Sequence, residues 1–549
     1  MIKRILFLSG LVTIIYLPMH AQVNVCEATW QKDTLILKND VIEQKLIWQK
    51  GELYNLSVAL VNIEDKITFD PNTPSVSIFG EKASVTKKNL EVIKIENHYL
   101  YPDHLQAHVI TRYPSIAIKR VFKIFPGSPA IACQYFYNDV KIKDDETAGQ
   151  KLIDGVENEN EKPVTDLRFH SYGLKNRHWQ VNYISFQDVT DQFNNLVKEN
   201  QMIPYRASQP LIANLLFTRD QLTNQQFFIL KESPLHHNQV NYPGADFIVS
   251  NQEISVTGLG IPFEPVQDWQ QGYTITTGCV GANSNALIIL RKYLKASRPY
   301  NPQHEMILMN TWGDRGRDGK ISEAFALREI EAGKHLGITH LQLDDGWQKG
   351  LSKNSASSGG RLWSMWPEGS WEPNPERFPD GLDKTVKAAQ KAGIKIGLWF
   401  NPTSANNFAT WERDANVLLE YYKKYNIATF KIDGLQIPNK TAEINLRNFF
   451  NKVMKEAHGQ VVFNTDVTAG RRGGYFFYDE YGNIFVENRY TDWANYYPYQ
   501  TLRNLWQLSR YVAPEKLQFE FLNKWRNTDK YPENDIFAPA NYEFEYLFA

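Results

Sequence analysis

The motif Lys431-Ile432-Asp433 is the strongest candidate for chemistry in this sequence. It ends an apolar run that reads as a strand, and residues two apart on a strand share one face. A lysine beside a carboxyl group lowers the pKa of that carboxyl, and a nucleophilic carboxylate must be ionised when its substrate arrives. A buried structural ion pair at a strand end explains the same spacing equally well.

Asp492 is the best partner acid for Asp433. It follows a later predicted strand and is flanked by aromatic residues, Tyr490 and Trp493. An aromatic wall desolvates a carboxyl group, which raises its pKa and lets it hold a proton near neutral pH. Two carboxyl groups with unlike pKa values are what glycoside hydrolysis requires. The alternative is an Asp that caps the following helix.

Asp344 and Asp345 form a second acidic pair after another predicted strand. Adjacent carboxylates accept hydrogen bonds from neighbouring sugar hydroxyls, and Trp312, Trp347 and Trp399, at or just beyond strand ends, offer aromatic faces to a sugar ring. Because a glycine follows, the spacing alone favours an ordinary turn over a sugar site. Clustered carboxylates also suit a divalent cation, but the spacing of a Ca²⁺ loop is missing. No closely spaced Cys/His pattern argues for zinc, so we expect neither metal nor cofactor.

Strand and helix patterns alternate with short links through the second half of the chain. Predicted strands cover residues 306–312, 339–343, 394–400, 428–432, 461–464, 484–487 and 517–521. Predicted helices cover residues 322–336, 382–392, 415–425, 442–457 and 499–512. This alternation predicts a parallel sheet, and this many units predicts a (β/α)₈ barrel of the TIM type. The acids described above all follow strands, at the end of the barrel where active sites form.

The first half of the chain has a different period. From about residue 30 to 295 the apolar residues alternate or form short runs such as 227–230 and 287–290, separated by turn residues. This pattern predicts an N-terminal β-sandwich. We therefore expect a multidomain β plus α/β protein, with the sandwich at 22–300 and the catalytic barrel at 301–549. The strand count reaches seven where a closed barrel has eight, so we expect the barrel to be truncated near its last strand.

Composition excludes several classes of protein. The 549 residues include 60 Lys and Arg against 61 Asp and Glu, which leaves a net charge of −1 and no footprint for nucleic acid or an anionic membrane. Charged residues make up 22% of the chain and aromatic residues 13%, so a disordered chain is excluded. The aromatic share suits a sugar site, but it also suits an ordinary core.

The first 21 residues read as a secretory signal peptide. Lys3 and Arg4 precede the apolar stretch 5–17, and Ala21 offers a small residue for cleavage. We expect an exported protein, periplasmic or extracellular, with no membrane span after signal removal. Three cysteines allow at most one disulfide. The adjacent pair at 236–237 is the only His pair, and we expect it in a solvated loop.

Several motifs resemble those of a known family. LQLDDGWQ at 341–348, GLWFNP at 397–402 and FKID at 430–433 occur in the order seen in α-galactosidases of glycoside hydrolase family 36. Residues 371–382 look like the family segment that leads into the second barrel helix. The resemblance is specific over about residues 305–435. It is looser toward the end of the chain and rests mainly on domain order in the β-rich half.

The resemblance implies an exo-α-glycosidase that retains configuration through a covalent glycosyl-enzyme intermediate. By match, Asp433 is the nucleophile and Asp492 the general acid/base. The substrate-binding candidates are Asp344, Asp345, Trp399, Lys431, Trp312 and Arg472. The implied substrate is a terminal α-galactoside of an oligosaccharide or polysaccharide. Family members carry a last strand and a C-terminal β domain beyond this point, which implies that the sequence is a fragment.

The sequence departs from the family at positions that touch sugar recognition. Asn401 and Thr403 flank Pro402, where the family often has Glu, and TAGRRG at 468–473 only faintly echoes a Cys-Ser-Gly-Gly-rich loop that ends in Arg. The reaction is therefore better determined than the sugar. The alternatives are an α-N-acetylgalactosaminidase, a β-L-arabinopyranosidase, or a raffinose-type transglycosylase. A carbohydrate-binding protein without catalysis is a second alternative.

Overall fold

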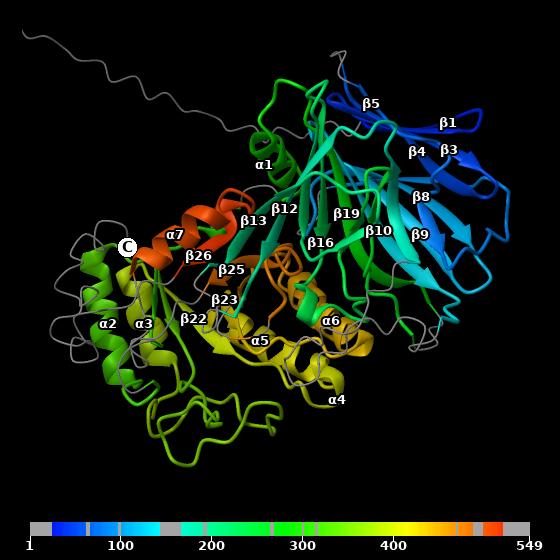
Figure 1. Cartoon of the computed structure of the whole chain (residues 1–549). Coiled ribbons are helices and arrows are strands. Elements are labelled where there is room, and N and C mark those ends of the chain that lie inside the picture. The colour runs from blue at the N-terminus through cyan, green and yellow to red at the C-terminus, as the bar shows by residue number, and fades with distance from the viewer. Residues whose placement is uncertain are drawn as a thin grey trace, which may run out of the picture.

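The protein consists of an antiparallel β half followed by an α/β half (Figure 1). The computed structural model describes residues 25–61, 66–96, 100–142, 166–189, 195–263, 268–298, 301–312, 317–467, 470, 472–486 and 498–519. The expected signal peptide lies outside these residues. Among the described helices, none combines the length and apolar character that a membrane crossing needs.

Three antiparallel sheets make up the β half. The first has the order β1 (Glu27–Gln31), β2 (Thr34–Lys38), β3 (Ile42–Gln49), β4 (Glu52–Leu60) and β5 (Lys66–Thr68). The second has the order β13 (Val197–Met202), β12 (Trp179–Phe186), β15 (Leu215–Asp220), β16 (Gln226–Glu232), β19 (Gln270–Cys279), β10 (Ala130–Asn138), β9 (Ala117–Ile124), β8 (His104–Arg112) and β7 (Glu91–Ile95). The third has the order β14 (Gln209–Leu211), β17 (Phe247–Val249), β18 (Glu253–Val256), β11 (Leu167–Gly173) and β6 (Val76–Ile78). The expected sandwich architecture is confirmed.

A curled parallel sheet forms the framework of the second half. Its strands are neighbours in chain order: β20 (Leu308–Asn310), β21 (His340–Leu343), β22 (Lys395–Phe400), β23 (Thr429–Ile432), β24 (Val462–Asp466), β25 (Gly482–Val486) and β26 (Leu517–Phe519). The helices are α2 (Glu323–Leu336), α3 (Asp383–Ala392), α4 (Ala405–Phe408), α5 (Trp411–Tyr425), α6 (Lys440–Glu456) and α7 (Pro498–Leu508). Each of the seven strands overlaps a predicted one, and the partial (β/α)-barrel architecture is confirmed.

One predicted strand is wrong. Residues 287–290 lie in helix α1 (Ala286–Ser297), which connects the two halves. The side chain of Asn285 caps this helix by accepting the backbone N–H of Leu287 at 2.9 Å. Tyr293 and Leu294 are buried one turn after Ile289 and Leu290, which gives the apolar run a helical face that the short stretch alone does not reveal.

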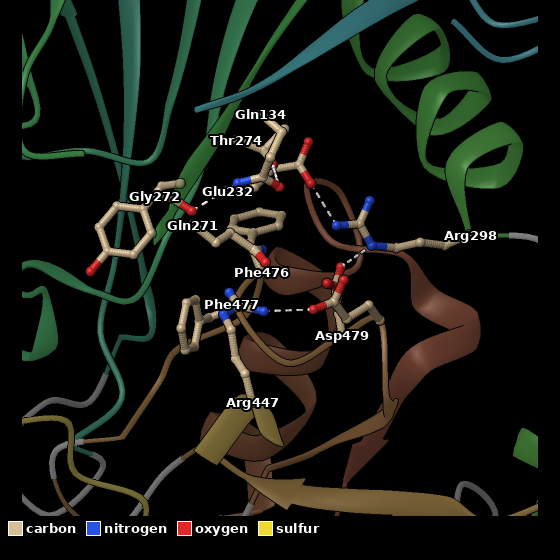
Figure 2. Close-up of a pocket in the computed structure, with 12 residues that line it drawn as sticks. Gln134, Glu232, Gln271, Gly272, Thr274, Arg298, Arg447, Phe476, Phe477 and Asp479 are labelled. Atoms are coloured by element: carbon tan, nitrogen blue, oxygen red, sulfur yellow. Dashed lines mark hydrogen bonds and ion pairs between the residues drawn. The ribbon is translucent and has the colours of Figure 1, made fainter. Parts of the chain in front are cut away.

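The two halves share a buried interface. Aromatic residues from β12 and β16 pack in one cluster with Tyr475 and Phe476, which follow β24. Beside this cluster lies a cavity of about 30 Å³, enough for roughly one water molecule (Figure 2). At its wall Arg298 bridges Glu232 of β16 and Asp479 of the α/β half, with both N···O distances at 2.6 Å. The ion pairs of Arg298 at this cavity therefore connect the two halves of the protein. Whether 22–300 and 301–549 are separate domains stays a prediction.

All three cysteines are buried and carry free thiols. Burial raises the pKa of Cys133 to about 12, because the thiolate is desolvated. Cys133 lies on β10 and Cys279 ends the neighbouring strand β19. Close packing, without a disulfide, therefore holds this part of the sandwich together.

Candidate active site

The predicted site residues meet at the carboxyl ends of three neighbouring strands. Trp399 of β22 pairs in register with Lys431 of β23, and Leu343 of β21 pairs with Leu398 of β22. Asp344 and Asp433 are the residues that follow β21 and β23. A parallel arrangement brings such ends to one edge of the sheet, which is where barrel enzymes bind substrate.

Asp433 is held in place by hydrogen bonds to both of its carboxylate oxygens. Its Oδ1 accepts the guanidinium Nη2 of Arg472 at 2.9 Å and the backbone N–H of Gly434 at 2.6 Å. Its Oδ2 accepts the indole N–H of Trp399 at 3.3 Å. The side-chain amide of Asn401 donates to the backbone carbonyl of Asp433 at 2.9 Å. The residue is 9% exposed, so these contacts fix both the position and the orientation of the carboxylate.

The surroundings of Asp433 favour its ionised form. Burial alone raises the pKa of this carboxyl, but the charges of Arg472 and Lys431, with the hydrogen bonds from Trp399 and Gly434, outweigh burial and lower the pKa. A lowered pKa keeps Asp433 charged at neutral pH. This is the state that the sequence pattern predicted for a nucleophile.

Lys431 and Asp344 form a buried ion pair at the same edge. Lys431 Nζ lies 3.0 Å from Asp344 Oδ2, and both side chains are almost completely buried. The ammonium also lies over the ring of Phe485, 4.8 Å from its centroid. Lys431 therefore combines the two roles that its spacing left open, because it is paired structurally with Asp344 and lowers the pKa of Asp433 electrostatically.

Asp345 has an environment unlike that of Asp344. The side-chain amide of Gln348 donates to its Oδ1 at 2.7 Å, and the hydroxyl of Ser352 donates to its Oδ2. Burial raises the pKa of Asp345 to about 7, because these hydrogen bonds do not compensate fully for lost hydration. Near neutral pH a share of the molecules therefore carries a protonated Asp345 that can donate a hydrogen bond.

Asp345→Asn should remove one component of the pH dependence of stability. The pKa of Asp345 rises from its ordinary 3.8 to about 7 on folding, so this group stabilises the fold at low pH. That contribution is lost as the pH rises from about 4 to 7. As the pH rises from about 4 to 7, the melting temperature of the Asn variant should therefore increase relative to that of the wild type. Parallel melting curves between pH 4 and 8 would contradict the assignment.

The tryptophans at the strand ends form the support of the site. Trp399 and Trp347 are each 1% exposed, and Trp347 donates its indole N–H to the carbonyl of Trp399 at 2.9 Å. Trp363 and Trp371 flank the ring of Trp399, with centroids 6.2 and 5.8 Å away. Trp399 thus orients Asp433 through its N–H. The expectation that Trp347 and Trp399 stack on a sugar is wrong, because both rings are buried and packed against protein.

Of the remaining predicted residues, one contacts Asp433, one lies after a neighbouring strand, and one lies outside the described residues. Arg472 lies after β24 and contacts Asp433, as described. Trp312 follows β20, is half-buried, and is next in sequence to Thr311, whose hydroxyl accepts the backbone N–H of Asp344 at 2.9 Å. Asp492 lies outside the described residues, so its distance to Asp433 stays a prediction. Within the described part of the chain, no group of three or more His, Cys, Asp or Glu residues could hold a metal.

The sequence missed a contribution from the β half. Asp188, which follows β12, accepts the backbone N–H of Arg472 at 2.9 Å. Its Oδ1 lies 3.0 Å from Nε2 of His237, whose side chain is only 7% exposed. The expectation of a solvated His loop at 236–237 is therefore wrong for His237, which is enclosed where the two halves meet. The nearby Asn238 accepts the backbone N–H of Ile437 at 2.8 Å, beyond the end of β23.

Comparison with known proteins matches this site to a family. Residues 273–426 match the melibiase family. α-Galactosidase 2 of Hypocrea jecorina is 31% identical over 142 residues, which cover 25% of this chain and 18% of that protein. α-Galactosidase 1 of Pediococcus pentosaceus is 29% identical over 103 residues, covering 19% of this chain and 12% of that protein.

Solved structures extend the likeness over most of the described fold. A GH36 α-galactosidase of Geobacillus stearothermophilus, in complex with raffinose, aligns with a TM-score of 0.58 at 10% identity, covering 89% of this chain and 79% of that chain. The chain is therefore similar to α-galactosidases in sequence over residues 273–426 and in fold over most of its length. The Lactobacillus brevis α-galactosidase shares the fold of this GH36-like protein, with a TM-score of 0.55, 12% identity, and coverage of 89% of this chain and 80% of that chain.

These likenesses confirm the resemblance that the motifs showed, because the proteins that match are α-galactosidases. The melibiase match contains Asp344, Asp345 and Trp399 but ends before Lys431 and Asp433. The GH36-like chain spans only 18% and 12% of the lengths of the two curated relatives in these alignments. The roles of Lys431, Asp433 and Arg472 therefore rest on the geometry described above.

Proposed function

We propose that this protein is a retaining exo-α-glycosidase that hydrolyses terminal α-galactosides. The observation that carries the proposal is the ionised, oriented carboxylate of Asp433 at a strand end, held between Arg472 and Trp399. A glycosidase nucleophile needs that combination of charge and fixed geometry. The family of the chain supports the reaction class.

In the first step Asp433 attacks the anomeric carbon. Its Oδ1 accepts two hydrogen bonds, whereas Oδ2 accepts one long one from Trp399. Oδ2 is therefore the oxygen that forms the ester bond, while Oδ1 stays anchored. The bond to the leaving oxygen breaks at the same time, and we assign Asp492 as the acid that protonates that oxygen. In the second step Asp492 takes a proton from water, the water oxygen attacks the anomeric carbon, and the carboxylate of Asp433 is released.

The acids after β21 suit the recognition of sugar hydroxyls. Asp344 accepts hydrogen bonds as a carboxylate held by Lys431, whereas Asp345 with its raised pKa can both donate and accept. This difference favours two adjacent hydroxyls with opposite hydrogen-bond roles. Relatives of this fold are described in complex with raffinose and stachyose, which supports galactosylated oligosaccharides as the substrates to test first.

Nitrophenyl glycosides test the proposal directly. The full-length protein should release nitrophenol from the α-galactoside faster than from the α-N-acetylgalactosaminide or the β-L-arabinopyranoside, and NMR should show the α-anomer of galactose first. A β-anomer formed first would refute retention. A faster reaction with another glycoside would show that the protein prefers that sugar. The residues beside Pro402, which differ from the family pattern, make this the main alternative. Binding of galactosides with no turnover of any glycoside would favour a carbohydrate-binding protein.

Transfer to an acceptor is the second candidate activity. The loop around Arg472 departs from the family pattern and lies on the nucleophile, so it could alter which acceptor reaches the intermediate. Incubation of nitrophenyl α-galactoside with excess sucrose separates the two reactions. Hydrolysis yields free galactose equal to the nitrophenol released, whereas transfer yields galactosylated sucrose and less free galactose than nitrophenol.

We also propose that the protein is exported. Lys3 and Arg4 followed by the apolar stretch 5–17 support this proposal. Expression in a Gram-negative host should yield a mature protein in the periplasm, with an N-terminus near residue 22. An unprocessed N-terminus in the cytosolic fraction would contradict it.

A further inference from the structure

We propose that Asp188 and His237 of the β half form a positioning pair that holds Arg472 on the nucleophile Asp433. This inference rests on the proposed function of Asp433. It assigns the β half a part in catalysis that its sheet structure alone does not suggest. Asp188 and Arg472 are 284 positions apart in sequence, and both are buried at the junction of the two halves.

The β half holds the backbone around Arg472 at two points. The carboxylate of Asp188 accepts the backbone N–H of Arg472 at 2.9 Å, and the carbonyl of the preceding residue, Gln187, accepts the hydroxyl of Tyr475 at 2.6 Å. Leu235 closes a third side, because a Cβ on Gly474 would lie 2.8 Å from its Cγ. These contacts fix the course of the segment at residues 472–475.

Fixing that segment fixes the guanidinium. Arg472 Nη2 reaches Asp433 Oδ1 at 2.9 Å, and Gly470 leaves room for the same side chain, since a Cβ there would lie 2.8 Å from Nη1. Arginine is long and has many rotamers, so an unanchored side chain would lose conformational freedom each time it bound Asp433. Anchoring its backbone to Asp188 lowers that cost and keeps the cation in place.

His237 contacts the same carboxylate from within the β half. Its Nε2 lies 3.0 Å from Oδ1 and 3.3 Å from Oδ2 of a carboxylate that is completely buried. A buried carboxylate needs donors, and Asp188 finds one in the β half and one in the α/β half. Asp188 and His237 therefore connect the β half to Arg472, which in turn contacts the nucleophile.

The charged groups near Asp433 and Asp188 determine how the activity of the protein should depend on pH. Arg472 and Lys431 face Asp433 and both lower its pKa, while His237 and Arg472 face Asp188. Lys431 also pairs with Asp344. Displacing Arg472 removes one of the two cations beside Asp433, so the acid limb of the activity profile should move to higher pH.

Asp188→Ala in the full-length protein tests the positioning role. The variant should lose about 10²-fold in kcat/KM on nitrophenyl α-galactoside. The acid limb of its kcat/KM profile should rise by about one pH unit. Asp188→Asn keeps an acceptor for the Arg472 N–H and should recover most of both effects. Asp220→Ala is the matched control, because Asp220 is a buried carboxylate of the same half that accepts the backbone N–H of Leu222.

A lowered kcat with an unshifted acid limb, or equal losses in Asp188→Ala and Asp220→Ala, would reduce Asp188 to a structural residue and overturn the inference. A crystal structure of Asp188→Ala gives a readout that needs no turnover. The Arg472–Asp433 contact should be broken in the variant, and an unchanged contact would overturn the inference. A wild-type protein inactive on every glycoside would instead refute the proposed function, while the crystallographic comparison would still decide the positioning role.

Discussion

Asp433→Asn should lower kcat on nitrophenyl α-galactoside by at least about 10⁴-fold, which is the scale of loss when a catalytic nucleophile is removed. The amide has nearly the shape of the carboxylate, and its one oxygen can still accept from Arg472, so the fold should be preserved. It carries no negative charge, however, and cannot form the glycosyl ester. Steady-state kinetics with matched circular dichroism spectra measure both properties.

A rescue experiment makes this result specific to the nucleophile. Asp433→Gly leaves space beside the anomeric carbon, and added azide should displace the nitrophenolate from the opposite face to give β-galactosyl azide. Asp383→Asn is the control for the same chemical change on the barrel, since Asp383 is exposed at the start of α3. Activity of Asp433→Asn near that of Asp383→Asn would remove Asp433 from the nucleophile role.

Lys431→Met should have the largest effect on stability among the site variants. It leaves Asp344 buried without its partner cation, and breaking a buried ion pair in this way costs about 3–5 kcal/mol in the free energy of unfolding. It also removes one of the two cations that lower the pKa of Asp433, so the acid limb of the activity profile should move to higher pH. Denaturant unfolding and the kcat/KM profile measure the two effects separately.

The double variant Lys431→Met with Asp344→Asn separates structure from catalysis. Removing both charges should recover part of the lost stability, because no uncompensated ion remains in the site. It should not recover activity, since Asp344, which we propose as a sugar ligand, is then also lost. A loss in Lys431→Met below about 1 kcal/mol would show that Asp344 finds other compensation and that the ion pair contributes little.

Local patterns in the sequence predicted the strands of the α/β half well. Each strand is a short apolar run with a turn or helix signal beside it, and that information lies within about ten residues. The same reasoning failed at 287–290, where four apolar residues fit a strand or a helix. The decision depends on the Asn285 cap and on the burial of Tyr293 against the sheet, which brings in distant packing.

The site was predictable from the sequence only where its residues lie at the ends of parallel strands. Lys431, Asp433 and Asp344 could be found because they lie at or just after strand ends, and parallel strands bring their ends together whatever lies elsewhere. The role of Asp188 could not be found, because its contact with Arg472 depends on how the two halves dock. Trp347 was misjudged for a related reason, since its spacing does not show that Trp371 and Tyr421 cover its faces.

Trapping the covalent intermediate tests the central claim most directly. A galactosyl fluoride with a second fluorine on the ring should react fast and hydrolyse slowly, so that fluoride leaves and the sugar stays bound as an ester. Mass spectrometry of the digested protein should then find the fluorosugar on the peptide that contains Asp433. A label on any other carboxylate, or fluoride release by an active enzyme that never becomes labelled, would contradict Asp433 as the nucleophile of a retaining glycosidase.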